Sequence, residues 1–269
     1  MAEIDFSANV ERFSGFADLY DRYRPHPPVA LADLLVRLSG GQVPELVVDL
    51  GCGTGLSTRY WADKARHVVG IEPSADMRRQ AESYTSPGDL SYREGFSHAT
   101  GLANACADIV TCSQALHWME PQGTFREAAR ILRPGGVFAA YDYDWPPATG
   151  HWRADQAFQA TLNRARQLQI ETGAEDGIQR WEKSGHLARM RASGCFRYVN
   201  EVVIHQIEPG NAERLSRLMY SQGGIMSLLK KGVSAAEIGL DELERVCKEE
   251  LGDISQNWYW SSRIRFGIK

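Results

Sequence analysis

A short apolar run followed by three closely spaced glycines constrains the fold of this chain more than any other feature. Residues 46–50 read Leu-Val-Val-Asp-Leu, and glycines follow at positions 51, 53 and 55. A run rich in β-branched residues is typical of a buried parallel strand, and glycines let the backbone turn sharply and approach a ligand closely. The segment therefore predicts a strand, a tight turn and a helix that begins near position 56.

Further apolar runs alternate with helical patterns along the chain. Strands are expected at 46–50, 67–71, 90–92, 107–112, 137–141, 196–208 and 258–268. Helices are expected at 8–23, 29–39, 56–65, 75–84, 122–132, 151–170, 179–193, 211–231 and 235–251. This alternation indicates βαβ units in an α/β fold with a doubly wound, mostly parallel sheet of seven strands. The two late strands predict an antiparallel edge.

The length and composition fit one domain with helical insertions. The chain has 269 residues, of which 43% are hydrophobic and 24% charged, which supplies enough apolar material for a large core. We expect a single domain over 1–269 with these parts: an N-terminal helical cap at 1–45, a cofactor-binding core at 46–145, helical lid insertions at 151–180 and 211–250, and edge strands at 196–208 and 258–268.

Charge and cysteine content exclude several classes of protein. The net charge of −4 argues against a general nucleic-acid binder, which usually carries a basic excess. The sequence has no apolar run of the ~18 residues that a membrane helix needs, and the N-terminus does not resemble a secretory signal. The odd number of cysteines, five, shows neither a zinc pattern nor a disulfide framework. These features predict a cytoplasmic protein without a metal site.

The spacing of the glycines limits the classes of ligand that the turn is expected to bind. Position 56 is Leu, so the turn reads GxGxG rather than the dinucleotide pattern GxGxxG, and it contains no Lys of a phosphate-binding loop. Asp49 places a carboxylate beside the turn, which disfavours a pyrophosphate and suits a cationic ligand. Glu72 ends the second strand 23 positions later, where a carboxylate can bind both hydroxyls of a ribose. The predicted ligand contains a ribose and lacks a diphosphate.

These motifs resemble those of the class I S-adenosylmethionine-dependent methyltransferases. Residues 47–55, VVDLGCGTG, match the first motif of that family, and the resemblance covers roughly residues 12–145. The run QALHW at 114–118 resembles the small-molecule branch, including trans-aconitate methyltransferase-like enzymes. The resemblance implies a Rossmann-like methyltransferase fold, S-adenosyl-L-methionine as cofactor and S-adenosyl-L-homocysteine as product.

The resemblance also implies a set of cofactor-binding residues. Those expected at the methionine part are Asp49, Gly51, Cys52, Gly53, Thr54 and Gln114. Those expected at the adenosine are Glu72 on the ribose, Pro73 and Met77 flanking it, and Phe96 and Ser97 near the adenine. Phe96 could equally enter the core. The segment from Tyr20 to Pro25 resembles one that folds over the cofactor, with Tyr20 as a contact and Arg24 on the cofactor's carboxylate.

Candidate acceptor residues follow the fourth and fifth strands. His117 is the candidate catalytic residue, as a general base or as a ligand of a substrate oxygen, and its alternative role is packing. Trp118 is a candidate for either the pocket wall or the core. Tyr141, Tyr143 and Trp145 could bind a flat or cationic acceptor, or belong to a solvated loop.

The predicted function is methyl transfer to a small molecule by in-line displacement. The sequence does not specify whether the methylated atom is O, N, C or S. One alternative is a non-catalytic protein that binds S-adenosylmethionine as a regulatory or partner subunit. Another is a tRNA or rRNA methyltransferase, although the end of the fourth strand lacks the Asn/Asp-Pro-Pro-Tyr motif that stacks a flipped base. A nicotinamide oxidoreductase is disfavoured by Leu56. No membrane partner is expected, and the chain could be a monomer or a homodimer.

Overall fold

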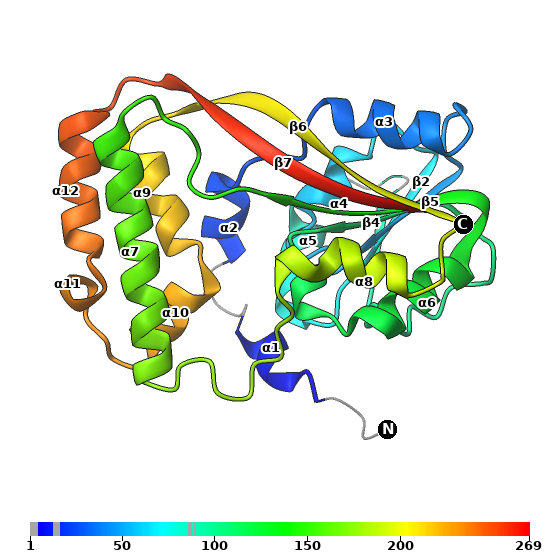
Figure 1. The fold of residues 1–269 in the computed structure, drawn as a ribbon, viewed down its shortest axis with the longest axis horizontal. Helices are drawn as coiled ribbons and strands as arrows, with labels where there is room; N and C mark the ends of the chain where they lie inside the picture. Colours follow the sequence, from blue (N-terminus) through cyan, green and yellow to red (C-terminus); the bar gives the residue numbers. More distant parts are fainter. Residues whose placement is uncertain (1–4, 13–16, 86–87, 89) are drawn as a thin grey trace. The chain divides into compact units, whose positions relative to one another are not determined.

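The computed structural model describes residues 5–12, 17–85, 88 and 90–269, and the chain divides into two compact units (Figure 1). The first, here called the helical unit, comprises 1–25, 144–178 and 205–261. The second, the sheet unit, comprises 26–143, 179–204 and 262–269. Each unit is described by itself.

The sheet has seven strands in the order β3-β2-β1-β4-β5-β7-β6. The strands are β1 (Leu46–Leu50), β2 (His67–Ile71), β3 (Leu90–Arg93), β4 (Ala107–Ser113), β5 (Leu132–Tyr143), β6 (Tyr198–Gly210) and β7 (Gln256–Ile268). Strands β1 to β5 pair in parallel, and β7 pairs antiparallel with β5. The doubly wound fold is therefore confirmed, and the antiparallel strand β7 lies one place in from the edge strand β6. The strand order reverses between β1 and β4, where open α/β sheets bind their ligands.

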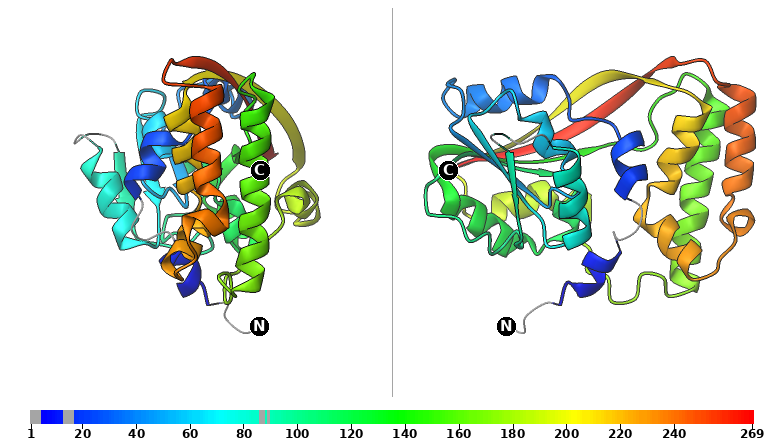
Figure 2. Two further views of the ribbon diagram at one scale, coloured as in Figure 1. Left: turned by 90° about the vertical axis from the view of Figure 1, so that its left-hand side faces the viewer. Right: turned by 180° about the vertical axis from the view of Figure 1, so that it is seen from behind.

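Helices cover both faces of the sheet, as Figure 2 shows from two further directions. The helices of the sheet unit are α3 (Ala30–Leu38), α4 (Leu56–Tyr60), α5 (Ala75–Ser83), η1 (Leu116–Trp118), α6 (Pro121–Ile131), η2 (Lys183–Gly185) and α8 (His186–Ala192). Val47 packs into a core with Leu35 of α3, whereas Val48 packs into a core with Phe125 of α6. Because both faces of β1 are buried, its sequence is apolar nearly throughout.

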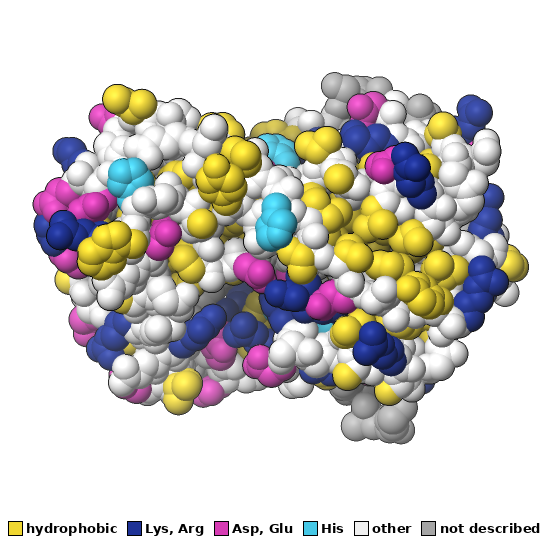
Figure 3. All heavy atoms as spheres, turned by 45° about the horizontal axis from the view of Figure 1, so that its top comes forward, with side chains coloured by type: hydrophobic (Ala, Val, Ile, Leu, Met, Phe, Trp, Pro, Cys, Tyr) yellow, Lys and Arg dark blue, Asp and Glu magenta, His cyan; other side chains and the backbone are white. Residues whose placement is uncertain are grey.

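Packing beneath α3 makes two of the expected helical segments differ from the prediction, one in its length and one in the unit to which it belongs. The helix expected at 56–65 ends at Tyr60, because the following turns bury Trp61 completely with the residues of α3. The helix α3 itself packs on the sheet, so the N-terminal cap expected at 1–45 is divided between the two units. Half-buried Val202 and Ile204 extend this core, and hydrophobic side chains gather on the surface of the sheet unit, at the right of Figure 3.

The helical unit contains α1 (Ser7–Glu11), α2 (Ala17–Tyr23), α7 (Trp152–Glu171), α9 (Ala212–Tyr220), α10 (Gly223–Lys230), α11 (Ala235–Ile238) and α12 (Leu240–Glu250). Helices α7, α9 and α12 pack against one another and bury Phe158, Leu215 and Leu243. The segments predicted as lid insertions thus gather in one compact unit with residues 1–25. Across the described ranges, no helix is both long enough and apolar enough to cross a membrane.

Candidate functional site

The turn after β1 lies at the reversal of strand order and has the geometry that only glycine adopts without strain. Gly51, Gly53 and Gly55 have φ angles of +64°, +55° and +80°. The amide of Gly51 donates to the carbonyl of Ile71 at 2.8 Å, which ties the turn to the end of β2. A Cβ at Gly51 would collide with Met119, whereas a Cβ at Gly53 would meet no atom within 4 Å. The backbone of Gly53 therefore borders open space.

Asp49 holds the turn from inside the protein. Its carboxylate is fully buried and accepts hydrogen bonds from the hydroxyls of Ser57, Thr58 and Thr111, the last two at 2.8 and 2.9 Å. Burial raises the pKa of Asp49, and the three hydroxyls oppose that shift. These bonds join β1, α4 and β4. The carboxylate thus fixes the segments on either side of the turn to one another. Its contact with a cofactor stays a prediction.

Glu72 presents its carboxylate at the end of β2, next to the turn. One oxygen accepts the amide of Gly53 at 3.0 Å, and the other accepts the amide of Ser74 at 2.9 Å. Burial raises the pKa of Glu72, while the two amide donors favour the charged form. Each carboxylate oxygen can accept a further hydrogen bond. The two amides fix the carboxylate in an orientation that is suited to a pair of neighbouring hydroxyl donors.

The other residues predicted to contact the adenosine follow Glu72 in the sequence. Met77 is buried in the first turn of α5, where its amide donates to the N-capping hydroxyl of Ser74 at 3.4 Å. Phe96 is 40% exposed and stacks on His98 with ring centroids 5.6 Å apart, so it does not belong to the core. Ser97 is buried and shares a hydrogen bond of 2.8 Å with the hydroxyl of Thr124. The ring of Phe96 is the exposed aromatic surface of this segment.

Three further predicted residues of the turn and its surroundings make local contacts, and their binding of a cofactor stays a prediction. Cys52 is buried, and burial together with the carboxylate of Glu72 raises the pKa of its thiol well above the usual value. Thr54 is buried, and its carbonyl accepts from the guanidinium of Arg59 at 2.7 Å. The carbonyl of Pro73 accepts from the guanidinium of Arg78 at 2.9 Å. The thiol of Cys52 is therefore protonated at neutral pH.

Gln114, which follows β4, has a strained backbone. Its φ angle is +51°, and its amide donates to the carbonyl of Tyr141 at 2.9 Å. Non-glycine residues with positive φ are uncommon, and such strain gathers at functional sites. The side-chain oxygen accepts from the ammonium of Lys183 at 3.1 Å. The buried side-chain nitrogen has no hydrogen-bond partner among the residues that the structure describes.

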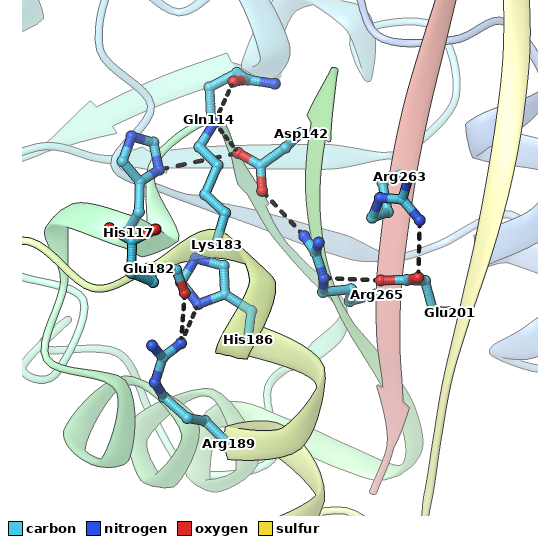
Figure 4. Close-up of polar contacts among 10 residues, drawn as sticks. All are labelled: Gln114, His117, Asp142, Glu182, Lys183, His186, Arg189, Glu201, Arg263 and Arg265. Carbon is cyan, nitrogen blue, oxygen red and sulfur yellow. Dashed lines mark hydrogen bonds and ion pairs between the residues drawn. The ribbon is translucent and has the colours of Figure 1, made fainter. Parts of the chain in front are cut away.

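A network of charged side chains lies beside Gln114 (Figure 4). Asp142, near the end of β5, is at its centre: its Oδ1 lies 2.8 Å from Lys183 Nζ, and its Oδ2 lies 3.2 Å from Arg265 Nη1. Nδ1 of His117 lies 3.9 Å from the same Oδ1, which is too long for a hydrogen bond. Sequence reasoning selected neither Lys183 nor Arg265, and it considered Asp142 only as one of two acids in the segment after the fifth strand that could bind a flat or cationic acceptor. A charged residue between the apolar Ile264 and Phe266 in a predicted strand was the one available signal.

The segment that precedes Lys183 also contacts the loop after β4. The amide of Trp181 donates to the carbonyl of His117 at 2.9 Å, and the guanidinium of Arg180 lies over the Trp118 ring at 5.4 Å. His117 is 5% exposed, and its ring centroid lies 4.5 Å from that of Trp118. Both candidate residues are therefore part of one contact between η1 and residues 180–183.

The prediction that Tyr141 lines an acceptor pocket is not supported. Its ring is 3% exposed and packs in the core beneath α3 with Leu31 and Ile264. The alternation of β5 explains the difference, because neighbouring side chains of a strand point to opposite faces. Asp142, one position later, faces the charged network instead. Tyr143 is buried at the end of the same strand.

Tyr20, Arg24 and Trp145 come together in the helical unit. The buried guanidinium of Arg24 lies 4.6 Å from the ring centroid of Tyr20 and 5.0 Å from that of Trp145. It also donates to the hydroxyl and the carbonyl of Ser221 at 2.8 and 2.7 Å. The structure thus brings these three candidates into one cluster, and their contact with a cofactor stays a prediction. Within the described part of the chain, no three His, Cys, Asp or Glu side chains form a metal-binding group.

Comparison with known proteins gives a family match and related folds. Residues 48–140 match a family model described as a methyltransferase domain. The chain is 28% identical over 172 residues to CRG1 of Saccharomyces cerevisiae, named a probable S-adenosylmethionine-dependent methyltransferase; the match covers 58% of this chain and 59% of CRG1. It is 33% identical to the malonyl-[acyl-carrier protein] O-methyltransferase of Pseudescherichia vulneris, with 54% and 57% covered.

These matches cover less than two thirds of the curated relatives' own length. Among solved structures, a type II methyltransferase candidate from Anaeromyxobacter dehalogenans superposes with a TM-score of 0.66 at 20% identity. That superposition covers 91% of this chain and 98% of the other. At this identity the likeness concerns the fold alone.

Proposed function

We propose that this chain, which belongs to the class I S-adenosylmethionine-dependent methyltransferases, transfers the methyl group of its cofactor to a small-molecule acceptor by in-line displacement. One observation carries the proposal: the glycine turn and the carboxylate of Glu72 meet at the point where the strand order reverses. The acceptor and the reacting atom are part of the proposal, because the relatives are matched over only part of their length.

The residues at the turn fit S-adenosylmethionine. The open space beside Gly53 leaves room for a ligand against the backbone, and a side chain at that position would fill it. The oriented carboxylate of Glu72 would accept the two ribose hydroxyls. The exposed ring of Phe96 would face the adenine. The negative charge of Asp49 behind the turn favours a cationic ligand over a pyrophosphate.

The cofactor supplies a methyl group on a positively charged sulfur. The protein's own contribution is alignment, which in well-oriented reactions removes several kcal/mol of the barrier. Gln114 would position one reactant through its side-chain N–H, because its oxygen is already bound by Lys183. His117 would remove a proton from the acceptor, or hold an acceptor oxygen, beside the end of β4.

Two observations favour a small metabolite or a small acyl group over a nucleic acid as acceptor. A relative's name specifies a malonyl group on a carrier protein as its substrate, and the segment after β4 lacks the proline-aromatic motif of enzymes that stack a flipped base. We further propose a cytoplasmic location, because all five cysteines are free thiols, as expected in a reducing compartment.

A substitution in the turn tests the cofactor site. In Gly53→Arg the side chain would occupy the proposed ligand space, so we expect no calorimetric binding of S-adenosylmethionine. Gly135→Arg is the matched control, since Gly135 also has a positive φ (+82°) with no atom within 4 Å of a built Cβ, but lies near the start of β5. Binding of equal strength in a folded Gly53→Arg protein would overturn the proposal.

A panel of small metabolites with S-adenosylhomocysteine formation as readout tests catalysis. A protein that binds the cofactor and yields no S-adenosylhomocysteine with any member would instead be a non-catalytic binder. Product formation with tRNA or rRNA alone would favour the nucleic-acid alternative. We expect product with a small molecule and indifference to added RNA.

A further inference from the structure

Strand β6 forms one edge of the sheet, and its sequence lacks the residues that usually protect an edge. In the described parts of the chain the sheet order ends at β6, which runs from Tyr198 to Gly210 beside β7 (Figure 1). An edge strand directs a row of backbone N–H and C=O groups away from the sheet, and proteins commonly guard such edges with Pro or Lys. Residues 198–208 contain neither. The sequence of this edge therefore does not prevent pairing with another strand.

The backbone groups that point outward can be assigned to alternate residues of β6. The amide of Glu201 donates to the side chain of Asn200 at 2.9 Å, which indicates that it points away from β7. Because backbone groups alternate in direction along a strand, those of Val203 and His205 point away from β7 as well. Pro209 occupies a later position of the same series and has no N–H to donate. The edge available for pairing thus ends before Pro209.

The side chains along this edge are largely apolar. Val203 is 41% exposed and Ile207 is 55% exposed. The one carboxylate of residues 198–207 belongs to Glu201, which forms ion pairs of 3.1 and 2.9 Å with two arginines of β7 and is 24% exposed. This charge is therefore drawn toward the neighbouring strand. Pairing at the edge would remove exposed apolar area from water, which is favourable.

The sequence of β6 is complementary to itself in one antiparallel register. When two copies of a strand pair about a two-fold axis, residues at equal distances before and after the axis lie opposite each other. With the axis at Val203, each apolar residue meets an apolar one, each amide meets an amide, and the acid meets an imidazole. The opposite pairs are Val203 and the partner's Val203, Val202 and the partner's Ile204, Glu201 and the partner's His205, Asn200 and the partner's Gln206, and Val199 and the partner's Ile207.

The neighbouring registers lack this match. An axis at Glu201 would place two carboxylates directly opposite each other, which destabilises a strand pair. An axis at Val202 would place Glu201 opposite the partner's Val203, and an axis at Ile204 would place it opposite the partner's Ile207. Both arrangements set an acid against an apolar side chain. Charge and polarity therefore favour the register about Val203.

We propose that two copies of this chain associate through β6, which pairs antiparallel with the same strand of the partner about Val203. The backbone groups of Val203 bond those of the partner's Val203. The amide of Glu201 exchanges the side chain of Asn200 for the carbonyl of the partner's His205. The occupant of this edge is a second copy of the chain, because the complementarity lies within the sequence of β6 itself. A single strand pair buries little area, so we expect a dissociation constant of about 1–100 µM.

Sedimentation equilibrium of the full chain tests the association. Over concentrations from about 1 to about 200 µM, we expect the mean mass to rise from that of one chain toward that of two. Val203→Lys would place two ammonium groups opposite each other at the axis, so this variant should stay monomeric. Val43→Lys is the matched control, because Val43 is 65% exposed and lies outside the strands. The control should associate as wild type does.

Two charge variants of His205 test the register. His205 is exposed, so both variants should fold. His205→Glu sets an acid opposite Glu201 at two symmetric positions, and we expect dimerisation to weaken by about 5- to 30-fold. His205→Lys keeps a cation opposite Glu201, and its dissociation constant should lie within about 3-fold of wild type. Both variants lose the contact of His205 Nδ1 with the hydroxyl of Ser261, so each controls for the other.

The possible outcomes are decisive for this interface. A wild-type protein that stays monomeric at the highest concentration would overturn the proposal, and so would assemblies larger than two chains. A dimer that Val203→Lys leaves intact would form through another surface and would also overturn it. Equal dissociation constants for His205→Glu and His205→Lys would contradict the register. If Val203→Lys does not fold, the two His205 variants carry the test. None of these measurements involves cofactor or acceptor, so they are independent of the methyltransferase function.

Discussion

The sheet unit contains two regions that differ in how they are built. The region after β1 and β2, with Gly53 and Glu72, consists of a short segment of chain whose backbone amides bind the carbonyl of Ile71 and the carboxylate of Glu72. The region after β4 and β5 consists of side chains brought from distant segments, such as Asp142, Lys183 and Arg265. The first region depends mainly on local backbone geometry, and the second depends on long-range pairing of side chains.

This difference has an energetic basis. Backbone amides are present whatever the side chains, so a cradle of amides needs only the right turn, which glycines at positive φ provide. A network of buried charges depends on every member, because removing one partner leaves another charge buried and uncompensated. The two regions should therefore respond differently to substitution, and the following predictions are arranged by expected size.

The largest effect is expected from His117→Asn. If His117 acts as a general base, the rate of methyl transfer should fall about 100-fold, the scale of a lost proton transfer, with the affinity for S-adenosylmethionine unchanged. S-adenosylhomocysteine formation measured from pH 6 to pH 9 checks this. A variant with the full rate across that range would assign His117 a packing role.

A pair of variants tests whether the two regions affect cofactor binding independently of each other. In Glu72→Gln we expect S-adenosylmethionine to bind roughly 10- to 30-fold more weakly, because an amide cannot offer two acceptor oxygens to the ribose. In Asp142→Asn we expect cofactor affinity within about 2-fold of wild type, because Asp142 contacts Lys183 and Arg265 instead. Calorimetry of both proteins gives the comparison, and equal losses would show that the regions are not independent.

Burial of His186, the first residue of α8, makes the free energy of unfolding of the protein depend on pH. Burial lowers the pKa of His186 to about 4, and its Nδ1 lies 3.0 Å from Arg189 Nη1, which makes it an acceptor. Because the unfolded pKa is near 6.5, the unfolded state gains the proton first, so stability is complete above pH 6.5 and is lost as the pH falls toward 4.

His186→Asn removes this titration and keeps an acceptor for Arg189. Between pH 7 and pH 5, we expect the free energy of unfolding of wild type to fall by about 2 kcal/mol more than that of the variant, as the shift in pKa requires. Urea unfolding at the two pH values measures the difference. Identical pH slopes for the two proteins would contradict the assignment.

The smallest effect is expected from the N-cap of α5, next to Glu72. Ser74→Ala removes the hydroxyl that caps α5 and should lower the free energy of unfolding by about 1 kcal/mol. Cofactor affinity should stay within about 2-fold, because the Ser74 amide that binds Glu72 is retained. Ser83→Ala, at the other end of the same helix, is the control and should change neither quantity. A larger loss of affinity would mean that the cap positions Glu72.

Local sequence predicts the strand and the glycine turn after it well because their determinants are local. The strand β1, the three glycines and Glu72 lie within 27 residues, and their types alone indicate a strand and a turn; the binding of a ribose by Glu72 stays a prediction. The doubly wound sheet is likewise confirmed, since alternating apolar runs are read from short windows. Tyr141, predicted at an acceptor pocket, packs in the core beneath α3 instead. The face toward which its side chain points depends on the register of β5 in the sheet, which local sequence does not contain.

By itself, the sequence determined the α/β class, the glycine turn and the match of residues 48–140 to a methyltransferase domain, because these depend on residue types at short separations. Only the tertiary structure decided which charges meet: Lys183 lies 41 positions after Asp142, and Arg265 lies in the last strand, with no local pattern to link them. It also ended α4 at Tyr60, because burial of Trp61 outweighed helical propensity. Long-range pairing is set by strand order and packing, which no short window of residues contains.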